Sequence, residues 1–144
     1  MTIDIATVPA AELVGDPAAV GLLHALPGWD FSDDQLRDSV VFVAYEGGLA
    51  TGYAIASVRF FDRGFVWMLA VDPAHRRQGV ATALMRTAED WCPSDRLFTS
   101  TNQSNAPARR LFESLGYLKS GIVENLDPGD PELFYCRILG DDPG

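Results

Sequence analysis

The sequence has little positive charge. Its 144 residues include 11 Lys and Arg against 20 Asp and Glu, for a formal net charge of −9, and Lys119 is the only lysine. A protein that binds duplex DNA needs a stripe of cations that displaces counterions from the phosphates, and the arginines form no such tract. We therefore expect no nucleic-acid partner, and a neutral or cationic partner fits the charge better.

Long apolar runs, a leader pattern and paired cysteines are also missing. The longest apolar runs are far shorter than the roughly 20 residues that span a bilayer. The N-terminus lacks the charged start and apolar stretch of a signal peptide. The two cysteines, Cys92 and Cys136, do not have the spacing of a disulfide framework or a zinc site. We expect a cytoplasmic protein with reduced cysteines, no membrane partner and no metal.

The remaining composition is that of a folded globule. Hydrophobic residues make up 47% of the sequence and charged residues 22%, close to the average of globular domains. A chain of this length forms about one domain with one sizeable core. We expect a single domain over residues 1–144.

The N-terminal part of the sequence alternates between strand and helix patterns. Residues 1–6 are typical of an edge strand, and a helix is expected over residues 9–26, with a break near Asp16-Pro17 left open. Its apolar positions are Leu13, Val20, Leu22, Leu23 and Leu26. Ser32 is the expected N-cap of a short second helix, with Gln35 completing a capping box. Residues 40–45 and 49–61 predict a hairpin whose second strand is broken by Gly52.

The later part predicts a strand and helix alternation. A turn is expected at residues 62–64, and residues 65–71 are continuously apolar, which is typical of a strand buried on both faces. Two amphipathic helices are expected over residues 80–91 and 108–115, the second closed by Gly116, with a short strand at residues 97–101 between them. Strands at residues 117–125 and 133–139 flank a loop rich in turn formers. The sequence therefore predicts an α/β fold around a mixed sheet of six or seven strands.

The most informative stretch joins the apolar strand to the next helix and reads Val71-Asp72-Pro73-Ala74-His75-Arg76-Arg77-Gln78-Gly79-Val80-Ala81. Gly79 permits close backbone approach, and Ala81 keeps the first helical turn free of bulk. The unpaired amides of the helix start and the two arginines favour an anion such as a diphosphate. Neither a P-loop nor a dinucleotide-binding glycine pattern is present.

These residues resemble the GNAT superfamily of acetyl-CoA-dependent N-acetyltransferases. The superfamily signature, Gln/Arg-x-x-Gly-x-Gly/Ala after a strand and a Val-Asp-Pro-like turn, corresponds to Arg76-Arg77-Gln78-Gly79-Val80-Ala81. A second element corresponds to Asn105-Ala106-Pro107-Ala108-Arg109-Arg110-Leu111-Phe112-Glu113-Ser114-Leu115-Gly116-Tyr117. The resemblance covers roughly residues 40–139. It implies a sheet whose central strands splay apart, with the pantetheine of acetyl-CoA in the opening.

The resemblance also implies a set of cofactor-binding residues. The end of the apolar strand would pair with pantetheine, and the loop would hold the pyrophosphate. Asn105 would cap the second motif helix and reach the cofactor, which this helix would also contact. These residues are Leu69, Ala70, Val71, Arg76, Arg77, Gln78, Gly79, Val80, Ala81, Asn105, Ala108 and Phe112. A strand amide near Leu69 or Ala70 is the candidate donor to the oxyanion.

The sequence departs from the superfamily pattern at the catalytic positions. The tyrosine that often protonates the departing thiolate is replaced by Phe112, and residues 65–71 contain no carboxylate that could serve as a base. Tyr135, Tyr53 and a water chain are candidate replacements, so the catalytic residues stay unassigned. Because a thiol is a tolerable leaving group, the loss of a general acid need not abolish transfer.

Two functions follow from this pattern. The first is acetyl transfer from acetyl-CoA to a primary amine by direct attack in a ternary complex, without a covalent enzyme intermediate, because neither cysteine lies in a motif. The alternative is a catalytically idle acyl-CoA-binding regulatory module. A domain without a cofactor would require both motifs to be coincidental. A homodimer that pairs its C-terminal strands is left open.

The acceptor side is expected around residues 8–38 and the loop of residues 126–132. Its acidic cluster is interpreted either as a solvated helix start or as a surface that attracts a cationic amine, such as a polyamine, an aminoglycoside or a basic peptide terminus. The candidate acceptor-side residues are Asp33, Asp34, Tyr53 and Trp67. His75 is expected to be a solvated loop residue.

Overall fold

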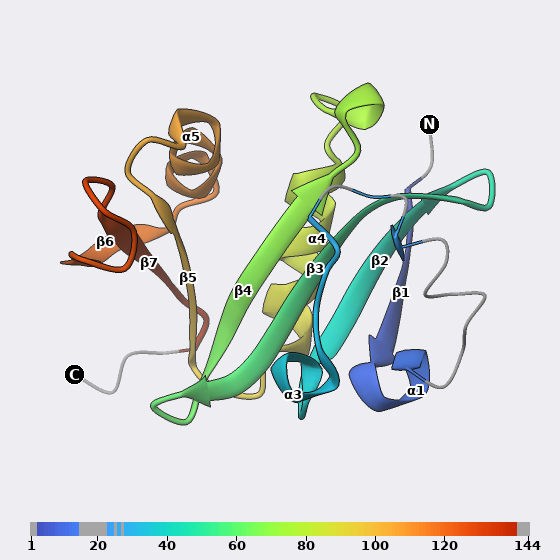
Figure 1. Ribbon diagram of the computed structural model, residues 1–144, viewed down its shortest axis with the longest axis horizontal. Helices are drawn as coiled ribbons and strands as arrows, with labels where there is room; N and C mark the ends of the chain where they lie inside the picture. Colours follow the sequence, from blue (N-terminus) through green and yellow to red (C-terminus); the bar gives the residue numbers. More distant parts are fainter. Residues whose placement is uncertain (1–2, 15–22, 25, 27, 141–144) are drawn as a thin grey trace. The chain divides into compact units, whose positions relative to one another are not determined.

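The computed structural model describes residues 3–14, 23–24, 26 and 28–140 (Figure 1). Its strands are β1 (Asp4–Pro9), β2 (Val40–Glu46), β3 (Leu49–Phe60), β4 (Arg63–Val71), β5 (Arg96–Asn102), β6 (Leu118–Val123) and β7 (Glu132–Ile138). Its helices are α1 (Ala10–Val14), α3 (Asp33–Leu36), α4 (Val80–Trp91) and α5 (Ala106–Ser114), with a 3₁₀ helix η1 (Pro73–His75).

The strands form one mixed seven-stranded sheet in the order β1-β2-β3-β4-β5-β7-β6. Only the β4–β5 pair is parallel among the pairings that the structure defines, whereas β1–β2, β2–β3, β5–β7 and β6–β7 are antiparallel. The predicted α/β fold with a mixed sheet is confirmed. Within this fold the chain forms two compact units, residues 1–57 with 67–91 (the N-terminal unit) and residues 58–66 with 92–144 (the C-terminal unit).

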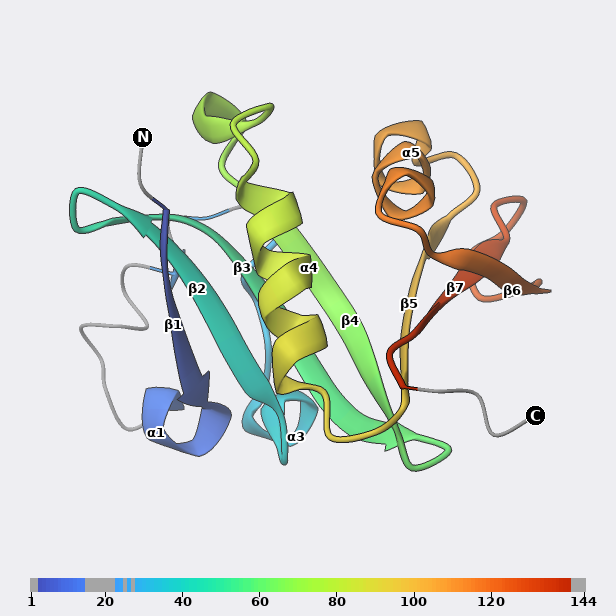
Figure 2. The same cartoon turned by 180° about the vertical axis from the view of Figure 1, so that it is seen from behind.

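In the N-terminal unit, both faces of β2 are buried. Alternate residues of a strand point to opposite faces. Val41 and Val43 therefore join the core formed with the N-terminal helices, while Phe42 packs edge-on against Trp91 of α4 at 5.8 Å between ring centroids. Figure 2 shows α4 lying across this second face of the strands. The predicted positions Val20 and Leu22 and the helix break near Asp16-Pro17 lie outside the described residues.

The prediction that Gly52 breaks β3 is wrong. β3 runs without interruption from Leu49 to Phe60. Its register with β2 shifts beside the glycine, because Ala44 pairs with Gly52 and Tyr45 with Ala50, which leaves Thr51 as an extra residue of β3. A Cβ atom on Gly52 would lie 2.9 Å from the Ala70 carbonyl oxygen and 3.0 Å from Val80 Cγ1. Gly52 therefore allows the end of β4 and the start of α4 to approach β3 closely.

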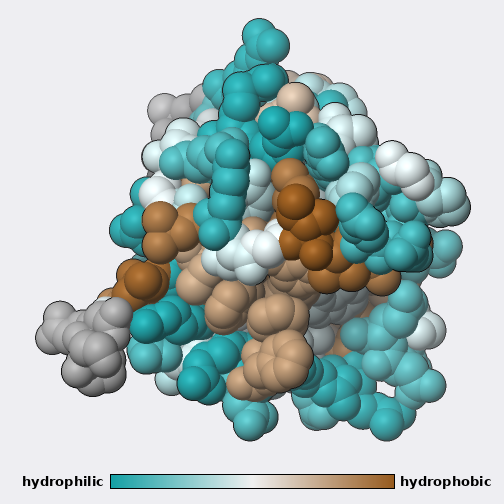
Figure 3. All heavy atoms as spheres, turned by 90° about the vertical axis from the view of Figure 1, so that its left-hand side faces the viewer, coloured by the Kyte–Doolittle hydropathy of each residue, from teal (hydrophilic) through white to brown (hydrophobic). Residues whose placement is uncertain are grey.

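The C-terminal unit is built on β5, β7 and β6, with α5 following β5. Four phenylalanines from its strands stack together, and the centroids of Phe60 and Phe65 are 4.9 Å apart. The others in this stack are Phe98 and Phe134. All six residues of the edge strand β6 are exposed, and Figure 3 shows apolar side chains gathered among polar ones on the side of the molecule that carries β6 and β7.

The predicted turn at residues 62–64 lies one residue earlier in the structure. The left-handed residues are Phe61 (φ 52°) and Asp62 (φ 61°), and Arg63 already belongs to β4. Gly64 is a strand residue of β4, and a Cβ atom there would lie 2.5 Å from Cys92 Sγ. This glycine marks close packing instead of a turn.

The prediction that residues 65–71 are buried on both faces is also wrong. Val66 is buried, whereas the rest of this run is partly exposed. Within the C-terminal unit, the start of β4 pairs in parallel with β5, Gly64–Val66 with Leu97–Thr99. A run of apolar residues shows that a strand can be buried. It does not show how much of each face of the strand other elements cover.

The two cysteines are free thiols, Cys92 directly after α4 and Cys136 within β7, as predicted. Burial raises the pKa of the Cys136 thiol. None of the helices in the described part of the chain is long and apolar enough to cross a membrane.

Candidate functional site

The start of the loop between β4 and α4 is anchored by a backbone hydrogen bond. The Asp72 amide donates a hydrogen bond to the Thr51 carbonyl oxygen at 2.8 Å, which ties the end of β4 to β3. His75 Nδ1 lies 2.8 Å from Asp72 Oδ2, and His75 Nε2 lies 3.9 Å from Glu46 Oε2 at the end of β2. The His75 side chain is 19% exposed. The prediction of a solvated histidine is therefore wrong, because the ring is mostly covered and makes a close contact with Asp72 of its own loop.

The rest of the loop is open and turns into the helix. Arg76, Arg77, Gln78 and Gly79 are exposed, and the backbone is left-handed at Arg77 (φ 64°) and Gly79 (φ 85°). A Cβ atom on Gly79 would meet nothing within 4 Å. The glycine is therefore needed for its left-handed backbone angle and not for close packing, and the space above the helix start is open.

The start of α4 presents its amides to this space. The Gly79 carbonyl oxygen accepts the bond from Ala83 N at 3.0 Å, so the helix begins directly after the glycine. The first amides of a helix have no partner inside it, and the helix dipole places partial positive charge there. With Arg76 and Arg77 beside them, these groups fit a phosphate or diphosphate. The exposed glycine turn and the helix start that the sequence predicted are present, and anion binding by them stays a prediction.

The strand that leads into the loop supplies Leu69, Ala70 and Val71, all of them partly exposed. They are the last three residues of β4 before Asp72, as the sequence predicted.

The second motif lies in the C-terminal unit. Asn105 is the N-cap of α5, and its side-chain oxygen accepts a hydrogen bond from the Ala108 amide at 3.2 Å. The loop before it is braced by Asp130, which accepts from the Ser104 amide at 3.0 Å and from the Ser104 hydroxyl at 2.6 Å. The predicted capping role is confirmed. Asn105 itself is exposed and Ala108 partly so.

Phe112 lies on the buried face of α5. It is 2% exposed, and its ring centroid lies 6.0 Å from that of Tyr117 and 5.5 Å from that of Tyr135. Tyr135 is fully buried, and its hydroxyl has no hydrogen-bond partner among the described residues. The sequence named Tyr135 only as one of several replacements for the missing acid. Nothing in its local pattern indicates a buried hydroxyl without a partner.

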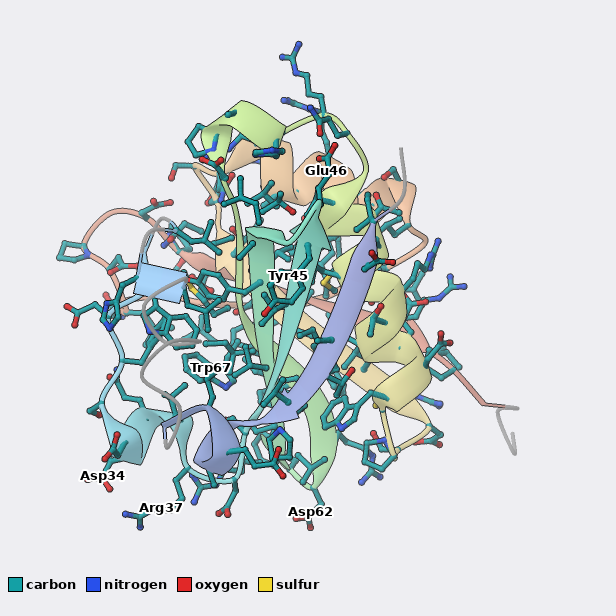
Figure 4. The ribbon with its side chains drawn as sticks, turned by 90° about the vertical axis from the view of Figure 1, so that its right-hand side faces the viewer. Asp34, Arg37, Tyr45, Glu46, Asp62 and Trp67 are labelled. Carbon is teal, nitrogen blue, oxygen red and sulfur yellow. The ribbon has the colours of Figure 1, made fainter. Side chains whose placement is uncertain are left out.

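The residues predicted for the acceptor side fall into two groups in the N-terminal unit. Asp33 and Asp34 are exposed in the first turn of α3, and Asp34 is ion-paired with Arg37, as Figure 4 shows. Ser32 and Gln35 form the predicted capping box around them. The acidic residues therefore do serve a helix start.

Tyr53 and Trp67 belong to an aromatic cluster with Trp29 and Phe31. Phe31 and Trp67 are 5.2 Å apart between ring centroids, and Trp29 and Tyr53 are 4.9 Å apart. Trp67 Nε1 donates to Ser39 Oγ at 3.3 Å. Tyr53 is fully buried, and this burial raises its pKa to about 12. The described part of the chain contains no group of three His, Cys, Asp or Glu side chains placed to hold a metal ion.

Comparison with known proteins identifies the family of this chain. The sequence model of the Acetyltransferase (GNAT) family matches residues 16–117. The chain belongs to this family. The ribosomal protein bS18-alanine N-acetyltransferase of Escherichia coli K12 is 30% identical over 131 residues, which are 85% of this chain and 87% of that protein.

Two solved structures show the same fold. The crystal structure of the ribosomal-protein-S18-alanine N-acetyltransferase from Escherichia coli has a TM-score of 0.75 at 23% identity and covers 98% of this chain and 96% of its own. An aminoglycoside 6'-N-acetyltransferase complexed with coenzyme A has a TM-score of 0.75 at 14% identity, with both chains fully covered. This GNAT protein is thus an acetyl-CoA-dependent N-acetyltransferase that transfers the acetyl group to an amine acceptor.

Proposed function

We propose that this N-acetyltransferase binds acetyl-CoA through the loop of residues 76–81 and acetylates the α-amino group at the N-terminus of a protein. The observation that carries the first part is the exposed start of α4 after Gly79, with its left-handed backbone and two arginines. In a protein with a formal net charge of −9, this cationic loop is a distinctive place for a pyrophosphate. The amides of residues 78–81 hold it, and Arg76 and Arg77 add charge-assisted contacts.

The remaining cofactor contacts are assigned from the two motifs. Leu69, Ala70 and Val71 offer main-chain groups to pantetheine, and a strand amide near Leu69 or Ala70 donates to the oxyanion of the tetrahedral intermediate. Asn105, Ala108 and Phe112 of α5 contact the cofactor. Binding in this way holds the thioester and the amine in line, which replaces a bimolecular encounter by a reaction within one complex.

The choice of a protein N-terminus rests on sequence similarity over most of the chain. The Escherichia coli relative acts on an alanine of a ribosomal protein according to its name, and the two proteins align over 131 residues. A substrate of this kind also supports a cytoplasmic location. An α-amino group arrives as an ammonium, which suits an acidic protein.

A small cationic amine is the second candidate acceptor. It is favoured by the exposed carboxylates of Asp33 and Asp34 at the start of α3. Because Asp34 is paired with Arg37, we expect these carboxylates to contribute less than the peptide backbone contacts of a protein substrate.

The experiment combines calorimetry with acetyl-CoA and thiol release on an acceptor panel. The panel holds a peptide with an N-terminal alanine, the same peptide blocked at its α-amine but carrying a free lysine, an aminoglycoside and a polyamine. The proposal expects binding and thiol release with the first peptide alone. Release only with the aminoglycoside or polyamine would overturn the acceptor assignment, and absence of binding would overturn the loop assignment.

A further inference from the structure

We propose that the C-terminal unit carries a binding site for a small carboxylate with an apolar body, in a cavity between α5 and the β6–β7 hairpin. The cavity has a volume of about 410 Å³, and small-molecule sites in proteins have volumes of about 300–1,000 Å³. All the residues that line it belong to the C-terminal unit. None of these lining residues is among those assigned to acetyl-CoA, so the site goes beyond the proposed function.

The first observation is the apolar wall of the cavity. It is formed by Ile122 of β6 and by Leu133 and Phe134 of β7. Ile122 pairs directly with Leu133 in the antiparallel ladder, so their side chains lie side by side on one face of the hairpin. Ile122 is 63% exposed. It therefore offers apolar surface, and an apolar ligand gains free energy by removing this surface from water.

The second observation is an irregularity of β6 at the cavity. Lys119 pairs with Tyr135 and Gly121 with Phe134, which leaves Ser120 as an extra residue of β6. Gly121 lines the cavity, its φ is 134°, and a Cβ atom on it would meet nothing within 4 Å. Bulges are frequent beside binding sites, and a strand glycine often marks a place where a ligand approaches the backbone closely. The bulge therefore leaves the cavity open along the backbone of β6.

The third observation is the charge around the cavity. Arg109 of α5 and Lys119 of β6 line it, and no carboxylate is among the lining residues. Lys119 is the only lysine in a chain with a formal net charge of −9. Two cations beside an apolar wall select an anion that carries an apolar group. A carboxylate fits best, because its two oxygens accept parallel hydrogen bonds from a guanidinium.

The two cations contribute unequally. Arg109 is partly buried, and its Nη1 donates to the Gln103 carbonyl oxygen at 2.6 Å. A guanidinium has five N–H donors, so this bond orients the group and leaves donors for a ligand. Lys119 is 74% exposed, and its Nζ lies 3.5 Å from Glu113 Oε1, which offsets part of its charge. We therefore expect Arg109 to bind the carboxylate and Lys119 to add a weaker attraction.

The test is a set of NMR titrations of the full chain with phenylbutyrate, phenylbutylamine, phenylbutanol and butyrate. The first three compounds share the apolar body and differ in charge, and butyrate keeps the carboxylate without the phenyl ring. We expect phenylbutyrate to shift the amide signals of Gly121 and Ile122. It should bind at least about tenfold more tightly than each of the other three, because it alone combines the charge-assisted contact with the apolar one.

Two matched pairs of variants locate the site. Arg109→Gln should weaken phenylbutyrate binding by about fivefold or more, whereas Arg110→Gln removes the same charge from the next residue of α5 and should change it by less than about twofold. Ile122→Ser should weaken phenylbutyrate and phenylbutanol alike, by about threefold or more. Val123→Ser, on the same strand but outside the residues that line the cavity, should bind both as the wild type does. The amide spectra of the four variants show that each is folded.

Four results would overturn the proposal. Equal affinity for phenylbutyrate, phenylbutylamine and phenylbutanol would show that the cavity does not select a carboxylate. Displacement of phenylbutyrate by acetyl-CoA would make the cavity part of the cofactor site. Equal losses in Arg109→Gln and Arg110→Gln would place the ligand elsewhere. If no compound binds and the Ile122 signal shifts with protein concentration, a second copy of the chain covers this face.

Discussion

The loop after β4 and the aromatic contact around Phe112 differ in exposure, in charge and in the chemical groups that form them. The loop is exposed, cationic and built largely from main-chain amides, whose direction is set by the left-handed backbone at Arg77 and Gly79. The contact of Phe112, Tyr117 and Tyr135 is buried and built from side chains, and the Tyr135 hydroxyl has no hydrogen-bond partner within the described part of the chain.

This difference predicts how each region should respond to substitutions. Side-chain changes in the loop should weaken binding gradually as long as the backbone keeps its course, because the amides remain. In the aromatic contact, a change in ring size should lower stability, because the rings are buried and packed against one another.

The largest effect should come from a change in the loop backbone. Gly79→Val places a β-branched residue at φ 85°, a region that costs such residues 1–2 kcal/mol or more. We expect the helix start to shift and the calorimetric affinity for acetyl-CoA to fall by at least about tenfold. Gly79→Asn, which tolerates left-handed backbone better, is the matched control and should lose less. Equal affinity in all three proteins would show that the loop amides do not bind the cofactor.

A smaller loss should follow from removal of the loop cations. Arg76→Ala/Arg77→Ala leaves the amides in place, so we expect the dissociation constant for acetyl-CoA to rise by up to about tenfold. Because exposed charges are screened, the difference from the wild type should shrink as salt is raised. Arg59→Ala/Arg63→Ala, which removes two arginines from the other end of the β3–β4 hairpin, is the control for net charge. A similar loss in that control would mean that the two loop arginines act only through overall charge.

Asn105 distinguishes capping from binding. Asn105→Ala removes the acceptor of the Ala108 amide and should lower stability by about 1 kcal/mol, seen as a Tm lower by a few degrees. Asn105→Ser keeps a capping oxygen, so its Tm should stay near that of the wild type. If Asn105 also contacts the cofactor, Asn105→Ser should still bind acetyl-CoA more weakly. Full affinity in this variant would limit the residue to capping.

The smallest effect concerns the buried tyrosine of the N-terminal unit. Burial raises the pKa of Tyr53 to about 12, whereas a tyrosine in an unfolded chain titrates near about 10. Between these values the unfolded state loses a proton that the folded state keeps, so the free energy of unfolding falls as pH rises. Tyr53→Phe should show a weaker fall in denaturant titrations from pH 9 to pH 11. Tyr45→Phe, at a partly exposed tyrosine of β2, is the control, and identical slopes in all three proteins would contradict this assignment.

Much of the loop could be predicted from the sequence because its features are local. A glycine two residues after an arginine pair, directly before a helical apolar pattern, specifies a left-handed residue and a helix start whatever surrounds them. The capping box of Ser32 and Gln35 and the N-cap Asn105 were predictable for the same reason.

The features that the sequence missed depend on contacts between distant segments. Gly64 is a glycine because of Cys92, which follows it by a strand and a helix. His75 lies 3.9 Å from Glu46 of β2, and the burial of the Tyr135 side chain depends on residues such as Phe112 that lie far from it in the sequence. None of these neighbours has a fixed spacing in the sequence, so no local pattern could indicate them.

The most direct test of the loop assignment is to measure both the acetyl-CoA dissociation constant and the transfer rate at saturation for the wild type, Gly79→Val and Gly79→Asn. The account predicts that Gly79→Val raises the dissociation constant most, that Gly79→Asn raises it less, and that both variants nearly keep the saturated rate. A loss of saturated rate with an unchanged dissociation constant would contradict the binding role of the loop.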